Sequence, residues 1–292
     1  MGSDQTVAVL GTGRMGAAMA RTLRQAGFDV VLYNRSADSA QALADEVGAT
    51  AVSTPREAAA AAQVVISSLA DDTAVTEVYS GPDGAAAGLG EGSVVLEMST
   101  IDPGTVAEIA PAIEAAGATL IDAPVSGSVP LVEQGALTVM AGGAGEGMET
   151  ARPVLDALAA KVYEVGDLGS GATMKLAVNA IVHAVNIAVA EALVLAEEAG
   201  VDRATAYEVF ANSAAGSPFI QYKRAAFENP EEAPVAFSLD LVAKDLDLIL
   251  GLADRVGVEM DQSAANRAVA GKAIAAGLGD RDMSAVAGYL RG

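Results

Sequence analysis

Residues 169–200 read GSGATMKLAVNAIVHAVNIAVAEALVLAEEAG and predict one long helix. From Met174 to Ala196 the stretch is apolar on nearly every face and contains no proline, as is typical of a buried helix. At about 1.5 Å per residue it is on the order of 40 Å long, more than a small domain needs. We therefore expect other helices or a second subunit to cover it.

The polar residues of this helix point to a functional site. Lys175, Asn179 and His183 recur four residues apart, so they share one face of the helix. A lysine in an apolar helix bundle is costly unless an anionic or polar group meets it. A lone histidine in a buried helix is more often structural, and we leave His183 out of the predicted site.

The composition indicates a globular protein of two domains. The chain has 292 residues, 52% of them hydrophobic, no cysteine and one histidine, which excludes disulfides and a zinc site. Its net charge of −21 disfavours nucleic acid and anionic membranes as partners. We find no run of 18 bulky apolar residues and no signal peptide, and we expect a cytoplasmic protein that does not cross a membrane.

A glycine-rich loop follows the first predicted strand, at residues 6–10. The loop residues are Gly11, Thr12, Gly13, Arg14, Met15 and Gly16. This is the GxGxxG pattern between a strand and a helix, which is typical of dinucleotide binding. Gly11 makes the tight turn, Gly13 lets the backbone approach a pyrophosphate, and Gly16 lets the helix pack on the strand. The phosphates are expected at the N-terminus of the following helix.

The end of the second strand, at residues 29–33, favours NADP over NAD. It is followed by Asn34, Arg35 and Ser36, where an NAD site would place an acid for the ribose hydroxyl. Arg35 is suited to stack on adenine and pair with a 2′-phosphate, with Asn34 and Ser36 donating hydrogen bonds. The alternative is that Arg35 is an exposed turn residue. We assign Asp38 to the next helix start.

Further apolar strands alternate with helical stretches and predict a doubly wound, mostly parallel sheet. These strands are expected at residues 64–69, 94–98, 119–123, 136–141 and 162–165, and the first domain ends near Gly166. Ligands of such sheets bind at the carboxyl ends of the strands. We expect Leu69, Thr100, Ser126 and Gly127 to lie at this edge. Thr100 is a candidate contact of the nicotinamide ribose or, equally, a helix N-cap.

The rest of the chain predicts only helices. They are expected at residues 202–212, 218–227, 238–256 and 262–276, and Gly257 suits a C′ position. Lys244 lies among apolar residues with Asp245 available to pair with it. The alternative is that Lys244 is a surface residue.

Four ordered motifs resemble the β-hydroxyacid dehydrogenase family over nearly the whole chain. They are residues 9–16 with Met19 and Ala20, residues 122–127, residues 169–171 followed by Lys175 and Asn179, and the pair Lys244–Asp245. Residues 127–128, 174–179 and 277–286 look most like the glyoxylate/succinic semialdehyde reductase branch. The chain departs from many relatives at Val178, where they have a second asparagine, and at Ala70, where they have proline. The first departure weakens assignment to the hydroxyisobutyrate branch.

The resemblance implies a Rossmann-like α/β domain at residues 1–166, joined by the long helix to an all-helical domain at 167–292. It implies a homodimer or homotetramer. Lys175 would be the catalytic general acid, and Ser126, Gly127 and Asn179 would bind substrate. Leu69, Thr100 and Lys244 would contact the cofactor. The expected reaction transfers hydride between NADPH and a small carboxylate-bearing aldehyde, or runs in reverse from the β-hydroxy acid.

Three alternatives share the architecture. Imine reductases and reductive aminases generally lack a lysine at the position of Lys175. Catalytically inactive oligomerisation modules also lose this lysine and carry DNA-binding extensions. A decarboxylating 6-phosphogluconate dehydrogenase has a histidine beside the helix asparagine, which this chain lacks. The presence of Lys175 and the acidic charge therefore favour the reductase.

Overall fold

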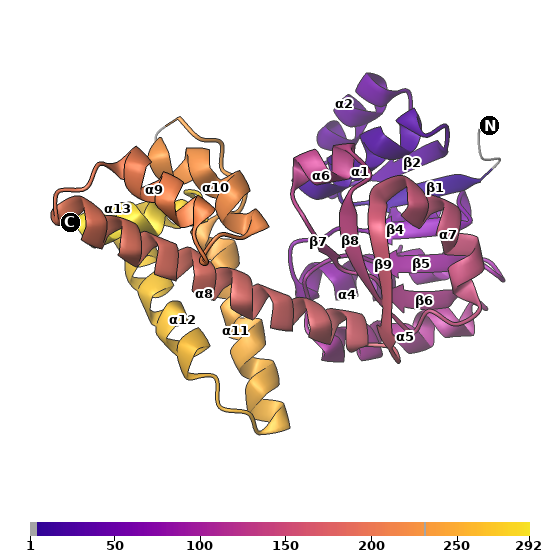
Figure 1. The fold of residues 1–292 in the computed structure, drawn as a ribbon. Coiled ribbons are helices and arrows are strands. Elements are labelled where there is room, and N and C mark those ends of the chain that lie inside the picture. Colours follow the sequence, from indigo (N-terminus) through magenta and orange to yellow (C-terminus); the bar gives the residue numbers. More distant parts are fainter. Residues whose placement is uncertain (1–4, 231) are drawn as a thin grey trace. The chain divides into compact units, whose positions relative to one another are not determined.

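The computed structural model describes residues 5–230 and 232–292, in two compact units, Met1–Lys175 and Leu176–Gly292 (Figure 1). The helix predicted from residue 169 onward begins in the first unit and continues into the second. The domain boundary expected near Gly166 stays a prediction.

The first unit is built on a mostly parallel sheet, which confirms the predicted fold class. Its strands are β1 (Thr6–Leu10), β2 (Asp29–Tyr33), β3 (Thr50–Ala51), β4 (Val64–Ser67), β5 (Val94–Glu97), β6 (Thr119–Asp122), β7 (Val125–Ser126), β8 (Leu137–Gly142) and β9 (Ala159–Gly166). Their order is β3-β2-β1-β4-β5-β6-β8-β7, with β9 beside β8. The pairs from β3 to β6 are parallel, as is β8 with β9, whereas β8 runs antiparallel to β6 and β7.

Helices pack on both faces of this sheet. They are α1 (Arg14–Gln25), α2 (Ala37–Val47), α3 (Pro55–Ala60), α4 (Asp72–Ser80), α5 (Pro103–Ala115), α6 (Val129–Glu133) and α7 (Gly147–Leu158). Successive side chains of a strand point to opposite faces. Val7 and Val9 therefore pack in one core with α1 and α7, and Ala8 and Leu10 pack in another with α4 and α5. This two-sided burial explains why the strands are continuously apolar.

The second unit is helical in all its described elements. They are most of α8 (Ser170–Glu198), then α9 (Arg203–Asn212), α10 (Pro218–Glu228), α11 (Leu239–Val256), α12 (Asp261–Ala273) and α13 (Val286–Arg291), with a π-helical turn (Ile274–Leu278) and a 3₁₀ turn (Met283–Ala285) before α13. Gly257 ends α11 with φ of 71°, which confirms its predicted C′ role. The last predicted helix ends earlier than expected, because Gly277 takes φ of 89° in the π turn.

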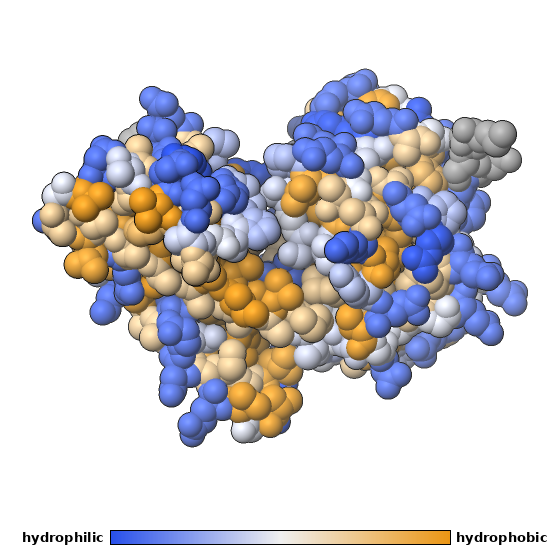
Figure 2. All heavy atoms as spheres, viewed as in Figure 1, coloured by the Kyte–Doolittle hydropathy of each residue, from blue (hydrophilic) through white to orange (hydrophobic). Residues whose placement is uncertain are grey.

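The α8 helix is only partly buried within one chain. Leu176, Ile187 and Leu193 lie in the core of the second unit, but Ile181 and Leu195 are 68% and 73% exposed. Apolar atoms gather on the visible face of this unit around α8 and the end of α11 (Figure 2). The chain's own described helices thus leave part of α8 uncovered, and cover by a second subunit stays a prediction.

Length and composition alone would also let α8 cross a membrane, unlike any other helix in the described part of the chain. Core helices of globular domains share these properties. The packing of α8 residues against α9, α10 and α11 in one hydrophobic core accounts for its composition.

Candidate active site

The glycine-rich loop has the geometry expected of a phosphate-binding turn. Gly11 has φ of 98°, and a Cβ there would lie 2.4 Å from the Ser68 carbonyl oxygen. A Cβ on Gly16 would lie 2.0 Å from the Gly11 carbonyl oxygen, so α1 packs directly on the turn. At Gly13, by contrast, a Cβ would meet nothing within 4 Å. The loop is thus closed on the protein side and open at Gly13, where α1 begins.

One buried polar atom of this loop fits a bound dinucleotide. The Thr12 hydroxyl is buried and has no hydrogen-bond partner among the described residues. Arg14 is exposed and Met15 is half-buried. The open N-terminus of α1 has no acidic residue in its first turn, so its free N–H groups suit a phosphate.

The turn after β2 is braced by Asn34. Its Oδ1 accepts a hydrogen bond from Thr12 N at 3.2 Å, and its Nδ2 donates to the Ser36 carbonyl oxygen at 3.2 Å. Asn34 therefore connects the two turns, in addition to its predicted contact with a phosphate. Arg35 and Ser36 are exposed, and Asp38 lies in the first turn of α2 as predicted.

The loops after β4 and β5 are tied together. Leu69 N donates to Ser99 Oγ at 2.8 Å, and Asp102 N donates to Asp72 Oδ1 at 2.8 Å. Asp102 caps α5 by accepting a hydrogen bond from Gly104 N at 2.7 Å. The alternative that Thr100 is the helix cap is therefore wrong. Leu69 and Thr100 lie on two loops that hold each other in place.

Asp122 joins the substrate-loop motif to the start of α8. Its two carboxylate oxygens accept hydrogen bonds from Gly169 N at 2.9 Å and from Ala172 N at 2.7 Å. A Cβ on Gly171 would lie 2.2 Å from the Asp122 carbonyl oxygen, so only glycine fits between them. Burial raises the pKa of Asp122, and these N–H groups offset part of the rise.

The predicted substrate residues follow Asp122 in the same unit. Ser126 is half-buried in β7 and pairs with Thr138 of β8. Gly127 has φ of 146°, where any side chain is strained, and a Cβ there would lie 2.6 Å from Leu137 Cδ2 and displace it. Lys175 is half-buried, one turn after the residues of α8 that Asp122 holds.

A second group of polar residues surrounds Asp245 in the helical unit. Asp245 is fully buried, and its Oδ2 accepts a hydrogen bond from Asn179 Nδ2 at 2.6 Å. Lys244 Nζ lies 3.1 Å from Asp245 Oδ1, which confirms the predicted pair. His183 Nε2 lies 3.4 Å from Asp245 Oδ2, and its ring is 5.9 Å from that of Phe237. The carboxylate thus gathers an amide, an imidazole and an ammonium group.

Glu97, Asp122 and Asp245 are buried acids whose roles were not predicted from the sequence. A signal existed for Asp245, because it lies on the apolar face of α11 between Val242 and Leu246. An acid on a buried face needs polar partners, and these are Asn179 and Lys244. For Glu97 the signal was a charged residue at the end of a buried strand.

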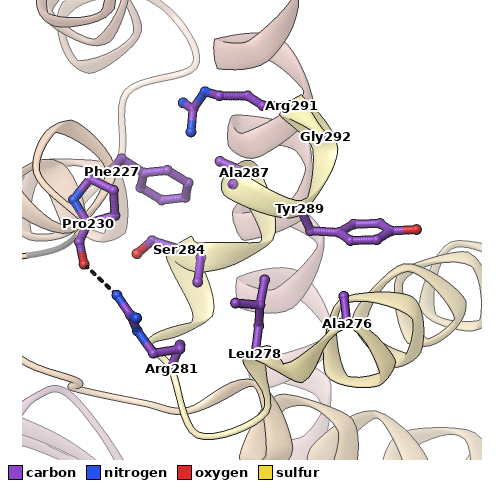
Figure 3. Close-up of a pocket in the computed structure, with 12 residues that line it drawn as sticks. Phe227, Pro230, Ala276, Leu278, Arg281, Ser284, Ala287, Tyr289, Arg291 and Gly292 are labelled. Atoms are coloured by element: carbon purple, nitrogen blue, oxygen red, sulfur yellow. Dashed lines mark hydrogen bonds between the residues drawn. The ribbon is translucent and has the colours of Figure 1, made fainter.

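A pocket of about 430 Å³ near the C-terminus contains none of the predicted site residues (Figure 3). It is lined by residues of α10, the π turn and α13, among them Phe227, Leu278 and Ala287. Its two arginines are already engaged. Arg281 donates to the Pro230 carbonyl oxygen at 3.4 Å, and Arg291 Nε donates to Glu197 at 2.7 Å. We do not assign this pocket to the substrate.

Comparison with known proteins identifies similar chains over almost the full length. A family model for the NAD binding domain of 6-phosphogluconate dehydrogenase matches residues 6–166. A model for the NAD-binding of NADP-dependent 3-hydroxyisobutyrate dehydrogenase matches residues 169–290. Glyoxylate/succinic semialdehyde reductase 1 of Arabidopsis thaliana is 34% identical over 280 residues, covering 96% of each chain.

Two solved structures share the whole architecture. The 3-hydroxyisobutyrate dehydrogenase from Salmonella typhimurium is 30% identical, with a TM-score of 0.90, covering 98% of this chain and 100% of that one. Psf3, solved in complex with NADP+ and 2-OPP, is 26% identical, with a TM-score of 0.88, covering 97% of this chain and 99% of that one.

The contacts of Asp122 predict the effect of its removal. Asp122→Ala leaves the N–H groups of Gly169 and Ala172 without acceptors, and we expect a loss of about 1–3 kcal/mol of unfolding free energy. The variant also no longer buries a charged carboxylate, which offsets part of this loss of unfolding free energy. Urea denaturation measures the change, and Asp38→Ala, on the exposed first turn of α2, serves as control. Equal stability of both variants would contradict the assigned role.

Proposed function

The chain belongs to the β-hydroxyacid dehydrogenase family, and from this premise we propose that it is an NADPH-dependent reductase of small carboxylate-bearing aldehydes. As an NAD(P)-dependent oxidoreductase acting on CH–OH groups, it also catalyses the reverse reaction from the β-hydroxy acid. One observation carries the proposal. The start of α8, held by Asp122, brings Lys175 into the same unit as Ser126 and Gly127.

The cofactor preference rests on the residues after β1 and β2. The open turn at Gly13 and the N-terminus of α1 suit the pyrophosphate. The chain has no acid at the end of β2, and exposed Arg35 supplies a positive charge for a 2′-phosphate. The similar Psf3 was solved with NADP+. These features favour NADP over NAD.

Lys175 is the proposed general acid. When bound, NADPH supplies the hydride that reduces the substrate carbonyl group. Negative charge then grows on the carbonyl oxygen, and the Lys175 ammonium group stabilises it and donates a proton. The Ser126 hydroxyl and the Gly127 N–H bind the substrate carboxylate and so orient the aldehyde.

Asn179 is a further proposed substrate contact and Lys244 a proposed cofactor contact, and both bind Asp245 within the helical unit. Asn179 orients the reacting oxygen or the lysine, and its Nδ2 is held by Asp245 at 2.6 Å. The ion pair with Asp245 restricts Lys244, the proposed cofactor contact. A carboxylate that fixes both side chains reduces the conformational entropy lost when cofactor and substrate bind.

We also propose a cytoplasmic homodimer or homotetramer assembled through the helical unit. Large apolar side chains of its helices are exposed in the single chain. They include Ile181 and Leu195 of α8, Val209 of α9 and Val256 of α11. Apolar surface of this kind marks a contact between proteins.

A substrate screen tests the reaction class. We expect NADPH oxidation with one or more of glyoxylate, succinic semialdehyde, methylmalonate semialdehyde and tartronate semialdehyde, and none with a cyclic imine. The ammonium group of Lys175 repels a cationic iminium, which explains the expected difference. Turnover of the imine alone would instead identify an imine reductase.

Lys175→Ala tests the general acid. We expect kcat to fall by about 10²- to 10⁴-fold, because neither the counter-charge nor the proton remains. The dissociation constant for NADPH, measured by fluorescence titration, should stay unchanged. Lys161→Ala, which removes an exposed lysine of β9, is the matched control and should keep full activity. Near-normal turnover of Lys175→Ala would refute the assignment.

Arg35→Ala tests the cofactor preference. Without the guanidinium group we expect KM for NADPH to rise about tenfold or more, while KM for NADH changes little. Arg152→Ala, which removes an exposed arginine of α7, controls for the loss of one positive charge. Equal effects on both cofactors would remove the argument for a 2′-phosphate contact.

Ile181→Asp tests the oligomer. A carboxylate in the centre of an apolar interface is costly, so we expect the variant to sediment as a smaller species than the wild type. Tyr163→Asp, at a similarly exposed position of β9 in the first unit, should keep the wild-type mass. An unchanged mass for Ile181→Asp would place the interface elsewhere.

A further inference from the structure

A chain of hydrogen bonds centred on Glu97 connects the ends of β4 and β5. Ser67 Oγ donates to Glu97 Oε2 and shares a hydrogen bond of 2.7 Å with the Tyr79 hydroxyl. Ser99 N donates to Glu97 Oε1 at 2.7 Å. Ser99 Oγ in turn accepts the hydrogen bond from Leu69 N at 2.8 Å. Glu97 is therefore attached to both loops that carry the proposed cofactor contacts.

Glu97 is a buried carboxyl group without a positive partner. It is 1% exposed, and no lysine or arginine within residues 5–230 and 232–292 forms an ion pair with it. The titratable groups that act on it are Tyr79 of α4, which is fully buried, and Asp122, its register partner on β6. Both are neutral or negative, so neither compensates the charge.

The surroundings of Glu97 place its titration in the neutral range. Burial raises its pKa to about 7, and the nearby Asp122 adds to the rise. The hydrogen bonds from Ser67 and Ser99 oppose it. The carboxyl group is thus protonated in mild acid and ionised in mild base. An ionised group here destabilises the folded protein, because its charge is removed from water without compensation.

We propose that Glu97 sets the preference of the cofactor site between the two redox forms of the nicotinamide, favouring the cationic oxidised form when Glu97 is ionised. This inference rests on the proposed function, since it takes the loops after β4 and β5 to bind the nicotinamide end. Ligands of such sheets lie at these strand ends. The position of a buried, uncompensated acid beside that edge is the observation that carries it.

The physical reason is the charge difference between the two cofactor forms. The oxidised ring carries one positive charge and the reduced ring is neutral, whereas the phosphates are the same in both. A buried carboxylate attracts the oxidised ring through a medium that screens charge poorly. We expect a preference of roughly three- to tenfold, which protonation of Glu97 removes.

Glu97→Gln separates the charge from the hydrogen bonds. The amide oxygen still accepts from Ser99 N, and the amide nitrogen donates to Ser67 Oγ, so the two loops stay connected. The variant therefore imitates the protonated acid at every pH. The substitution therefore removes the charge of Glu97 and keeps its hydrogen bonds with Ser67 and Ser99.

The experiment measures the dissociation constants of NADPH and NADP+ by isothermal titration calorimetry at pH 6 and pH 8.5. In the wild type, the ratio of the NADPH constant to the NADP+ constant should be about three- to tenfold larger at pH 8.5 than at pH 6. In Glu97→Gln the ratio should stay at the low value at both pH values. Titration of the 2′-phosphate, with a pKa near 6, affects both forms and cancels in the ratio.

Two controls and a stability measurement complete the test. Glu114→Gln removes an exposed acid of α5, and Tyr79→Phe removes the hydroxyl group beyond Ser67 but keeps the acid; both should keep the pH-dependent ratio. The raised pKa makes the folded wild type lose stability as pH rises from about 4.5 towards 7. The melting temperature of Glu97→Gln should therefore exceed that of the wild type at pH 8.5. The difference in melting temperature should be smaller at pH 6.

The possible failures are distinguishable. If Glu97→Gln has the wild-type ratio at pH 8.5, or melts no higher there, the inference is overturned while the cofactor binding itself still supports the proposed function. If the wild type binds neither redox form, both are overturned. The same measurement with NAD+ and NADH follows the same expectation, so the choice between NADP and NAD does not affect it.

Discussion

Two hydrogen bonds from the start of α8 to the carboxylate of Asp122 are the constraint on which the proposed site depends. They attach the first turn of a 29-residue helix to the carboxyl end of β6. Free N–H groups at a helix N-terminus favour an anion, and here a strand of the same unit supplies it. Ser126 follows Asp122 in the chain, and Lys175 follows Gly169 and Ala172. The carboxylate of Asp122 therefore fixes the backbone just before each of these two site residues.

Three buried acids serve three different purposes because their surroundings differ. Asp122 is held by backbone N–H groups, and Asp245 by the amide of Asn179 and the ammonium group of Lys244. Glu97 has only hydroxyl and backbone donors. Asp245 has a cation beside it, whereas burial raises the pKa of Asp122 and raises that of Glu97 to about 7. Environment, and not residue type, assigns such roles.

Regular patterns in the sequence predicted most of the fold. The GxGxxG turn, the apolar strands and the long helix each repeat a period or spacing that identifies the element. The elements that were missed are short. The two-residue strands β3 and β7 and the helix α6 contain too few residues to show any period. The same holds for α13, which follows the irregular turn at Gly277.

The sequence by itself determined the fold class and the glycine turn, because these depend on patterns among near neighbours in the chain. It also supplied the residues proposed for the reductase site. Only the tertiary structure decided which distant side chains donate hydrogen bonds to the buried carboxylates of Asp245 and Glu97. Asn179 and Asp245 are 66 positions apart, and Ser67 and Glu97 are 30 apart. No local pattern encodes such pairs, since they form when separate elements pack and water is excluded between them. Burial at such a contact raises the pKa of Glu97 to about 7.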